Sequence, residues 1–175
     1  EQAIREALSD SGLNFSDIEQ AYAGYVYGDS TCGQKVIYRV GMTGIPVFNV
    51  NNNCSTGSSA LYMARQAVES GLVDCALAVG FEQMQPGALG SVWDDRPGPF
   101  DDFDTSCNAI FESEAPLALR YFGGAGKSHM DKYGTEISDF AKIRAKASRH
   151  AMNNPKALFR TELSEGDVLQ SPEMI

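Results

Sequence analysis

A cysteine at position 54 follows a short apolar segment and precedes a run of small residues, in the sequence Asn49–Leu61 (NVNNNCSTGSSAL). Residues 46–50 predict a short strand that is covered on both faces, because the segment is apolar. Small and apolar residues then recur at i, i+3 and i+4, which predicts a helix with a mostly small-residue stripe: Gly57, Ala60, Leu61, Ala64, Ala67, Val68 and Leu72. We therefore expect Cys54 at or just before the first turn of this helix.

This position suits a nucleophilic thiol. The unpaired N–H groups and the positive dipole end at a helix start stabilise a nearby anion, and the thiolate is the nucleophilic form of cysteine. The same N–H groups can hold the oxyanion that forms when the sulfur attacks a carbonyl. The alternative is an inert buried thiol, which is common for free cysteine. The flanking sequence favours the nucleophile.

A cysteine nucleophile needs a general base, and the chain has two histidines, His129 and His150. Neither has a spacing that indicates catalysis, and both lie in polar, helical surroundings typical of surface histidines. We therefore expect the acid and base that serve Cys54 to come from sequence outside this chain. The first residue is not methionine and the N-terminal residues have a helical pattern at once, so the chain is expected to be an internal piece of a longer protein.

Composition excludes several classes. With 175 residues and 43% apolar residues, the chain can build a hydrophobic core. Its net charge of −9 argues against a nucleic-acid binder. No apolar run reaches the roughly 18 residues of a membrane span. The four cysteines (Cys32, Cys54, Cys75 and Cys107) have no C-x-x-C spacing, which favours an intracellular, reducing compartment.

The segments around Cys54 alternate between helix and strand. We predict a helix over residues 1–12 that ends at Gly12, a strand over 21–27, a helix over 34–40 capped by Ser30 or Thr31, and a strand over 73–81. Helices between strands imply a parallel sheet with helices on its faces. Ligands gather at the carboxyl ends of such strands, where Cys54 and Glu82 both lie.

From Gln83 onward, proline, glycine and aspartate replace this alternation. Clustered aspartates could hold a divalent metal, but they lack the spacing of a calcium loop, so we predict a solvated acidic loop and no metal site: Asp94, Asp95, Asp101, Asp102 and Asp104. Two helices are predicted after it. One covers residues 113–133, interrupted or kinked by Pro116 and Gly123-Gly124, and the other covers 139–152 with Ser138 as its cap.

Residues 142–160 contain six basic residues and no acidic one. Such a stretch could bind phosphate or could be a solvated helix face, and the sequence leaves both open. Gly123–Ser128 (GGAGKS) ends like a P-loop, but Tyr121 stands where that motif needs glycine and no strand precedes it, which argues against nucleotide hydrolysis.

Several segments together resemble thiolases, and in particular the sterol carrier protein type of thiolase. They are Tyr22–Gln34 (YAGYVYGDSTCGQ), Gly41–Pro46 (GMTGIP), Asn51–Ser58 (NNNCSTGS), Ala78–Met84 (AVGFEQM) and Gly126–Gly134 (GKSHMDKYG). The resemblance implies an α/β thiolase fold, five-layered (α-β-α-β-α) when complete. Residues 1–84 would form most of the N-terminal core, without its first strand, and residues 85–175 a mainly helical loop domain, with the C-terminal half absent.

The resemblance also implies an activity. Cys54 matches the family's nucleophile, which takes the acyl group of a 3-ketoacyl-CoA while acetyl-CoA or propionyl-CoA leaves, and a second CoA then collects the acyl group. CoA is thus a substrate, and no resident cofactor is expected. Residues 94–104 and 111–114 match the family poorly, so the acyl class stays open. A non-catalytic acyl-CoA or lipid-binding subunit and a condensing enzyme are the alternatives.

By the same resemblance, the loop domain holds CoA. Tyr121 and Phe122 would line the channel for pantetheine and acyl chain, and the basic residues Arg144, Lys146 and Arg149 are our candidates for the CoA phosphates. Family members form dimers or tetramers through the strand before Cys54, at Asn51–Asn53; local turn capping is the alternative role for those asparagines. The expected compartment is the cytoplasm in a bacterium and the peroxisome in a eukaryote, and this chain alone should be nearly inactive.

Overall fold

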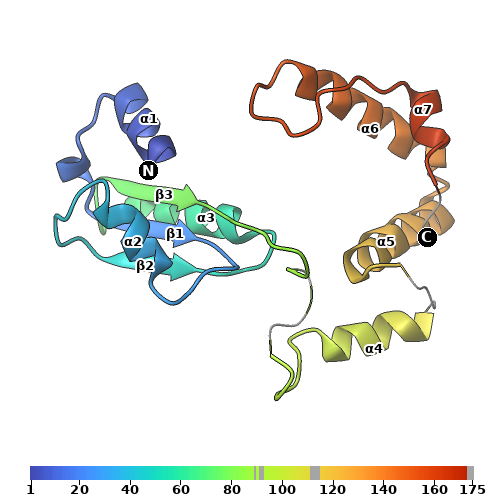
Figure 1. Ribbon diagram of the computed structural model, residues 1–175, viewed down its shortest axis with the longest axis horizontal. Coiled ribbons are helices and arrows are strands. Elements are labelled where there is room, and N and C mark those ends of the chain that lie inside the picture. The colour runs from blue at the N-terminus through green and yellow to red at the C-terminus, as the bar shows by residue number, and fades with distance from the viewer. Residues whose placement is uncertain (89, 91–92, 111–114, 173–175) are drawn as a thin grey trace. The chain divides into compact units, whose positions relative to one another are not determined.

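The computed structural model describes residues 1–88, 90, 93–110 and 115–172. The chain divides into two compact units, Glu1–Gly90 and Ser91–Ile175 (Figure 1). This division comes after Gly90, a few residues beyond the boundary after Met84 that the sequence predicted. Residues 111–114 lie outside the described residues, and so does the start of the helix predicted over 113–133.

Unit 1 alternates helices and strands in the predicted order. Its elements are α1 (Gln2–Ser11), the short 3-10 helix η1 (Phe15–Asp17), β1 (Gln20–Gly24), α2 (Cys32–Tyr38), β2 (Val47–Val50), α3 (Thr56–Glu69) and β3 (Ala76–Gly80). Gly12 ends α1 in the left-handed conformation, with φ 72°, as predicted. The strands are shorter than predicted, because the apolar residues at their ends lie in the connecting turns.

The three strands form a parallel sheet in the order β2-β1-β3, which confirms the predicted parallel α/β architecture. Gly24 of β1 lies opposite Val50 of β2 and Gly80 of β3. Among the described residues β2 is an edge strand, and its Phe48 is 43% exposed. The prediction that this strand is covered on both faces is therefore wrong, because α3 packs mainly over β1 and β3.

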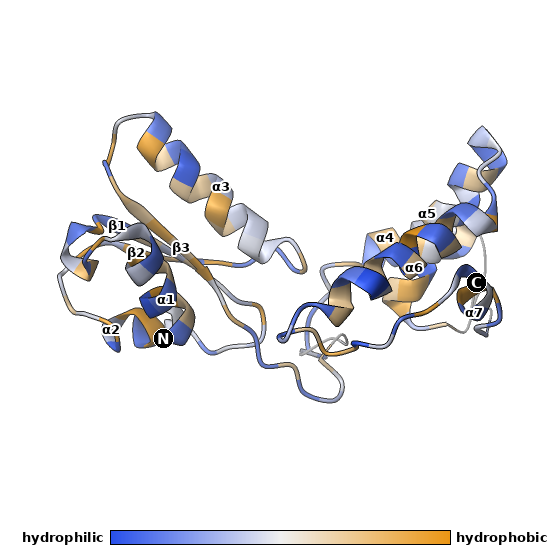
Figure 2. Cartoon of the chain, turned by 90° about the horizontal axis from the view of Figure 1, so that it is seen from above, coloured by the Kyte–Doolittle hydropathy of each residue, from blue (hydrophilic) through white to orange (hydrophobic). Residues whose placement is uncertain are grey.

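Helices cover both faces of the sheet, with α3 on one face and α1 and α2 on the other (Figure 2). Alternate residues of β1 supply the two cores, as the period of a strand requires. Ala21 packs with Ile4, Ile37 and Leu77 on the α1–α2 side. Tyr22 packs on the α3 side.

The stripe predicted on α3 is buried only in part. Its alanines Ala60, Ala64 and Ala67 are buried, whereas Leu61 and Val68 are exposed, as is Leu72 beyond the helix end. The helix thus rests on the sheet through side chains that each end at a methyl group. A helix seated on alanines approaches its sheet closely.

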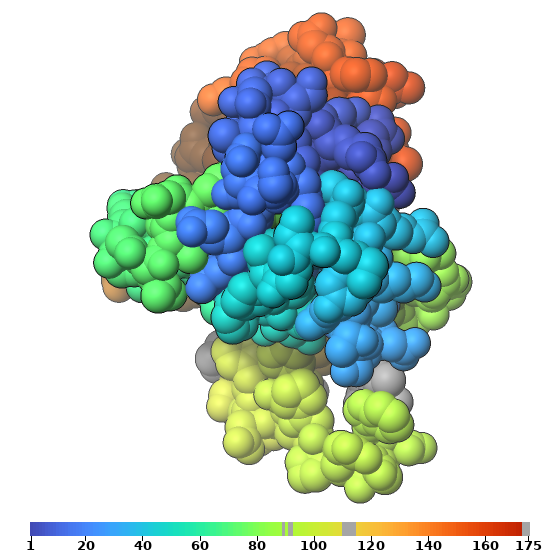
Figure 3. Space-filling view, turned by 90° about the vertical axis from the view of Figure 1, so that its left-hand side faces the viewer, coloured from blue at the N-terminus to red at the C-terminus, as the bar shows by residue number. Residues whose placement is uncertain are grey.

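The N-terminal helix α1 packs on the face of the sheet opposite α3. Figure 3 shows it (blue) against the segment that contains α2 and β2 (cyan). Arg5 donates from Nη2 to the carbonyl oxygen of Arg39 at 3.2 Å, which joins α1 to the end of α2. Helices α1 and α2 are therefore joined by a side-chain contact as well as by their packing on the sheet.

Unit 2 is helical, with α4 (Asp101–Ile110), α5 (Leu117–Tyr133), α6 (Ile137–Met152) and α7 (Glu165–Leu169). The predicted acidic loop is wrong from Asp101 onward, where α4 begins. Asp101, Asp102 and Asp104 occupy the first turn of α4, where the helix dipole favours negative charge. The Asp101 carboxylate also accepts a hydrogen bond from the Gly98 N–H at 2.8 Å.

Two details of the later helices differ from prediction. Helix α5 begins after Pro116 but runs without interruption through Gly123 and Gly124, so the predicted break at these glycines is wrong. Helix α6 begins at Ile137, and its cap is Glu136, whose N–H donates to the Asp139 carboxylate at 3.2 Å, instead of Ser138. Helix α7 was not predicted, because five residues are too few for a clear period.

In the part of the chain that is described, none of the helices combines the length and the apolar character that crossing a membrane requires.

Candidate active site at Cys54

Cys54 lies in the turn between β2 and α3, one residue before the cap of the helix, as the sequence predicted. Its side chain is exposed, so it is not the buried thiol of the alternative interpretation. The residue before it, Asn53, has a φ of 47°, which is uncommon outside glycine and makes the chain reverse sharply. The reversal presents the thiol at the carboxyl edge of the sheet.

The turn is held by hydrogen bonds among its own residues. The N–H of Ser55 donates to the Asn52 carbonyl and the N–H of Thr56 to the Asn53 carbonyl, both at 3.1 Å. These two donors are therefore engaged within the turn. Of the donors that the sequence suggested for an oxyanion, the backbone N–H of Cys54 itself stays a candidate.

The asparagines before Cys54 make local contacts. The side-chain oxygen of Asn51 accepts from the Asn53 N–H at 3.3 Å, and the side-chain amide of Asn52 donates to the Ser59 hydroxyl at 2.9 Å. These bonds fit the local capping role that the sequence left open.

Glu82 follows β3 and lies at the same edge of the sheet as Cys54. Its carboxylate accepts hydrogen bonds from the backbone N–H groups of Val26 at 2.9 Å and Tyr27 at 3.1 Å. These residues follow β1, so Glu82 fixes the loop beside the site. The sequence placed Glu82 at this edge but gave no indication of its partners, because they lie more than 50 positions away.

The other cysteines are less exposed than Cys54. Cys75 precedes β3 as a half-buried residue, and burial raises the pKa of its thiol, with the nearby Asp17 adding to the effect. A raised pKa leaves less thiolate at neutral pH. Cys54 therefore combines the greatest exposure with the position at a helix start.

Tyr121, a predicted channel residue, lies at the contact between α4 and α5. Its ring packs edge-on against Phe103 with 4.6 Å between ring centroids, and its hydroxyl donates to the Asp104 carboxylate. Burial, and then the bond to Asp104, raises the pKa of Tyr121 to about 12. The neighbouring Phe122 is 75% exposed. Of this pair, Phe122 is the side chain available to a ligand.

The basic candidates lie on α6, and all three are exposed. Lys146 and Arg149 are three residues apart, so they share one side of the helix. Arg144 is two residues from Lys146 and lies on the opposite side. Lys146 and Arg149 can therefore form one basic patch on α6, and Arg144 lies apart from it.

The histidines and the P-loop-like segment lie where the sequence analysis expected residues without a catalytic role. His129 and His150 are both exposed, and Nδ1 of His129 lies 2.9 Å from the Thr135 hydroxyl oxygen. Lys127 of the P-loop-like segment lies within α5 and pairs with Asp131 at 2.6 Å, which rules out the strand–loop–helix context of a P-loop. Among the described residues, no group of His, Cys, Asp and Glu could hold a metal ion.

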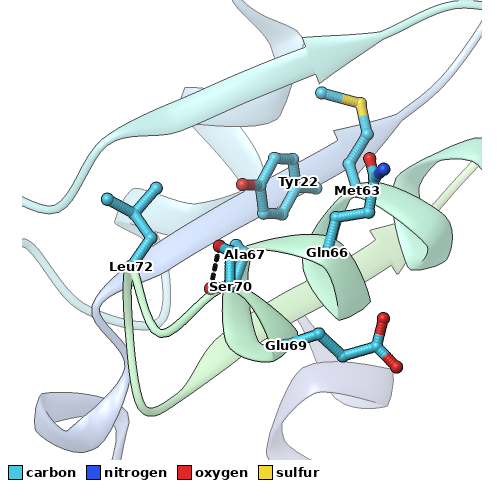
Figure 4. Close-up of a pocket in the computed structure, with 7 residues that line it drawn as sticks. All are labelled: Tyr22, Met63, Gln66, Ala67, Glu69, Ser70 and Leu72. Carbon is cyan, nitrogen blue, oxygen red and sulfur yellow. Dashed lines mark hydrogen bonds between the residues drawn. The ribbon is translucent and has the colours of Figure 1, made fainter.

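A groove on unit 1 lies away from Cys54. Figure 4 shows it between β1 and the C-terminal half of α3, with Tyr22, Met63 and Leu72 around it. Cys54 precedes the opposite end of α3, and a 14-residue helix is about 21 Å long. The groove is therefore separate from the candidate site.

Comparison with known families decides the assignment. The family model described as the N-terminal domain of thiolase matches residues 1–163. The chain belongs to the thiolase family. Its parallel α/β core is that of the fold that the sequence resemblance implied.

Several curated thiolase-like proteins are similar to the chain. It is 50% identical over 172 residues to sterol carrier protein 2 of Oryctolagus cuniculus, covering 97% of the chain and 31% of that protein. It is 42% identical to non-specific lipid-transfer protein-like 2 of Caenorhabditis elegans, covering 97% and 42%. It is 32% identical to benzoylsuccinyl-CoA thiolase subunit BbsB of Thauera aromatica, again covering 97% and 42%. The chain thus spans about a third to two fifths of these relatives.

The contact of Tyr121 with Asp104 generates a pH prediction for this thiolase chain. Because the pKa of Tyr121 is raised above 10.0, its contribution to stability is complete below about pH 10 and is lost as pH rises towards 12. Asp104→Asn should make Tyr121 ionise at lower pH, because the carboxylate opposes the phenolate. Ultraviolet titration, with Tyr121→Phe subtracted as reference, measures this. Asp102→Asn on the same helix is the control, and an unchanged Tyr121 titration in Asp104→Asn would contradict the contact.

Proposed function

We propose that this chain is the N-terminal part of a 3-ketoacyl-CoA thiolase, an acyltransferase of lipid degradation that works through an acyl group on Cys54. The observation that supports it is an exposed cysteine at a strand-to-helix turn, at the carboxyl edge of the sheet of an N-terminal thiolase domain. The chain covers less than half of its relatives, so the activity belongs to the intact protein.

In the first half-reaction, the Cys54 thiolate attacks the C3 carbonyl of a 3-ketoacyl-CoA, and the carbonyl electrons move to the oxygen. When the carbonyl re-forms, the bond between C2 and C3 breaks. The electron pair stays on C2, which takes a proton from a general acid and leaves as acetyl-CoA, or as propionyl-CoA from a 2-methyl-branched substrate. The acyl group remains on Cys54 as a thioester.

In the second half-reaction, the thiol of a new CoA loses its proton to a general base and attacks the Cys54 thioester. The sulfur of Cys54 leaves as thiolate, and the shortened acyl-CoA departs. The cycle thus returns Cys54 to its starting state and needs one acid and one base. Unit 1 contains no histidine, and we propose that those groups come from outside unit 1 in the intact protein.

The acyl group is proposed to be long-chain, branched or a sterol side chain. Support comes from relatives whose names refer to sterol carriage and lipid transfer, and from one named as a CoA thioester thiolase subunit. The same carrier names favour a second candidate, a non-catalytic subunit that binds acyl-CoA or lipid. A condensing enzyme, which would run the carbon–carbon step in reverse, uses the same nucleophile. The proposed compartment is intracellular, and peroxisomal in a eukaryote.

CoA is proposed to contact unit 2 through Lys146 and Arg149 at its phosphates and through Phe122 at its apolar part. Support for this comes from their exposure and, for the two basic residues, from their common side of α6. Arginine and lysine form charge-assisted hydrogen bonds with phosphate. Tyr121 would act indirectly, by holding α4 against α5.

A homodimer or homotetramer through β2 is proposed as the assembly. Its support is that β2 is an edge strand among the described residues, and an unpaired edge can pair with another chain. Sedimentation velocity of the intact protein should give at least twice the monomer mass at micromolar concentration. A monomer throughout the range would contradict the assembly.

Cys54→Ala tests the reaction. In the intact protein this substitution should lower turnover by more than about a thousandfold, because the covalent route is lost. Mass spectrometry of the unsubstituted protein with 3-ketoacyl-CoA alone should show the acyl group on the peptide that contains Cys54. Cys32→Ala is the control and should keep turnover. Acyl-CoA binding without turnover or an adduct would favour the carrier instead.

Charge reversal on α6 tests the phosphate contacts. Lys146→Glu and Arg149→Glu should each lower the affinity for CoA by about tenfold, since a hydrogen bond to a charged group is worth about 1.5–3 kcal/mol. Arg144→Glu makes the same charge change on the other side of the helix and should alter CoA affinity less than about twofold. The affinity for pantetheine, which lacks the nucleotide phosphates, should be unchanged in all three variants. An equal loss of affinity for CoA and for pantetheine would contradict the assignment of Lys146 and Arg149 to the CoA phosphates.

A further inference from the structure

Thr56 is a buried polar residue two positions after Cys54. Its exposed fraction is 5%, and it is the first residue of α3. A buried hydroxyl is favourable only where it is hydrogen-bonded, so its partners indicate its role. Both of its partners belong to the turn that presents Cys54.

The Thr56 hydroxyl bonds to the backbone on both sides of Asn53. It accepts from the Asn52 N–H at 2.8 Å and donates to the Asn53 carbonyl at 2.6 Å. A hydroxyl can do both at once, so one side chain holds the peptide groups 51–52 and 53–54. Asn53 between them has a φ of 47°, a conformation that needs such support in a non-glycine residue.

The methyl group of Thr56 fixes the same residue to the sheet. A β-carbon added at Gly24 of β1 would lie 2.8 Å from the Thr56 methyl carbon and 3.2 Å from its carbonyl oxygen, so the first turn of α3 presses on a bare glycine. At Gly80, opposite Gly24 on β3, an added β-carbon would meet nothing closer than 3.9 Å. The close approach is therefore specific to Gly24.

We propose that Thr56 is a positioning residue for Cys54. Its hydroxyl holds the strained turn, its methyl anchors that turn on Gly24, and together they set the direction of the Cys54 sulfur and N–H. The proposal rests on the proposed role of Cys54 as nucleophile. A threonine that only stabilised the fold would affect melting but not the turnover of folded enzyme.

Two substitutions separate the hydroxyl from the methyl. Thr56→Val keeps the shape and removes both hydrogen bonds, and in the intact protein it should lower kcat by about tenfold or more with KM within about twofold, because a small misplacement of a reacting group is costly. Thr56→Ser restores the hydroxyl and should recover kcat to within about threefold. Ser58→Ala, an exposed hydroxyl on the same helix, is the control.

A matched glycine pair tests the anchor without removing a polar group. Gly24→Ala should lower kcat as Thr56→Val does, whereas Gly80→Ala should leave it within about twofold. If Thr56→Val does not fold, the two glycine variants still test whether the contact between Thr56 and Gly24 positions Cys54. Equal kcat values in the two glycine variants, or unchanged kcat in folded Thr56→Val, would overturn the proposal.

Alkylation by iodoacetamide gives a measurement that does not depend on turnover. The rate at the Cys54 peptide should change at least about threefold in Thr56→Val and return in Thr56→Ser, while the rate at Cys32 in the same sample stays constant. If the Cys54→Ala protein turned over normally, the proposed function would fail while this measurement still tested Thr56. An unchanged Cys54 rate in folded Thr56→Val would overturn the positioning role alone.

Discussion

The close contact between the first turn of α3 and the bare backbone of Gly24 is the constraint on which the candidate site depends. It brings the helix start onto the carboxyl edge of the sheet, and a β-carbon at Gly24 would lie 2.8 Å from the Thr56 methyl carbon. The strained Asn53 and the exposed Cys54 lie just before this contact. Position, exposure and backbone direction of the thiol thus follow from one packing arrangement.

Two carboxylates reinforce opposite edges of the sheet in unit 1. Glu82 at the end of β3 binds the backbone just after β1, and Glu19 before β1 accepts from the Asp74 and Cys75 N–H groups at 2.6 and 3.2 Å. Both ends of the β1–β3 pair are therefore closed by carboxylates that bind backbone donors. Such bonds are stronger than neutral ones. Those of Glu82 hold the loop beside the site, and those of Glu19 close the opposite edge of the sheet.

How much the sequence could predict depended on the range of the interactions. The helix–strand order, the parallel sheet and the place of Cys54 followed from local periodicity and from the small residues after the cysteine. The exposed side of β2 and the helix at Asp101 did not, because burial depends on what packs above a strand and an aspartate run suits a loop and a helix start equally. The separation of Arg144 from Lys146 follows from their two-residue spacing within the helix that the sequence predicted over 139–152.

The alanine seat of α3 has a consequence for how such a domain can change over time. Most protein cores drift by exchanging one large apolar residue for another, because the total volume can be kept. Apart from glycine, Ala60, Ala64 and Ala67 have no smaller substitute, and a larger one pushes away from the sheet the helix that begins just after the thiol. Along this face, selection for a stable fold and selection for a reactive cysteine act on the same atoms, so neither can be relaxed alone.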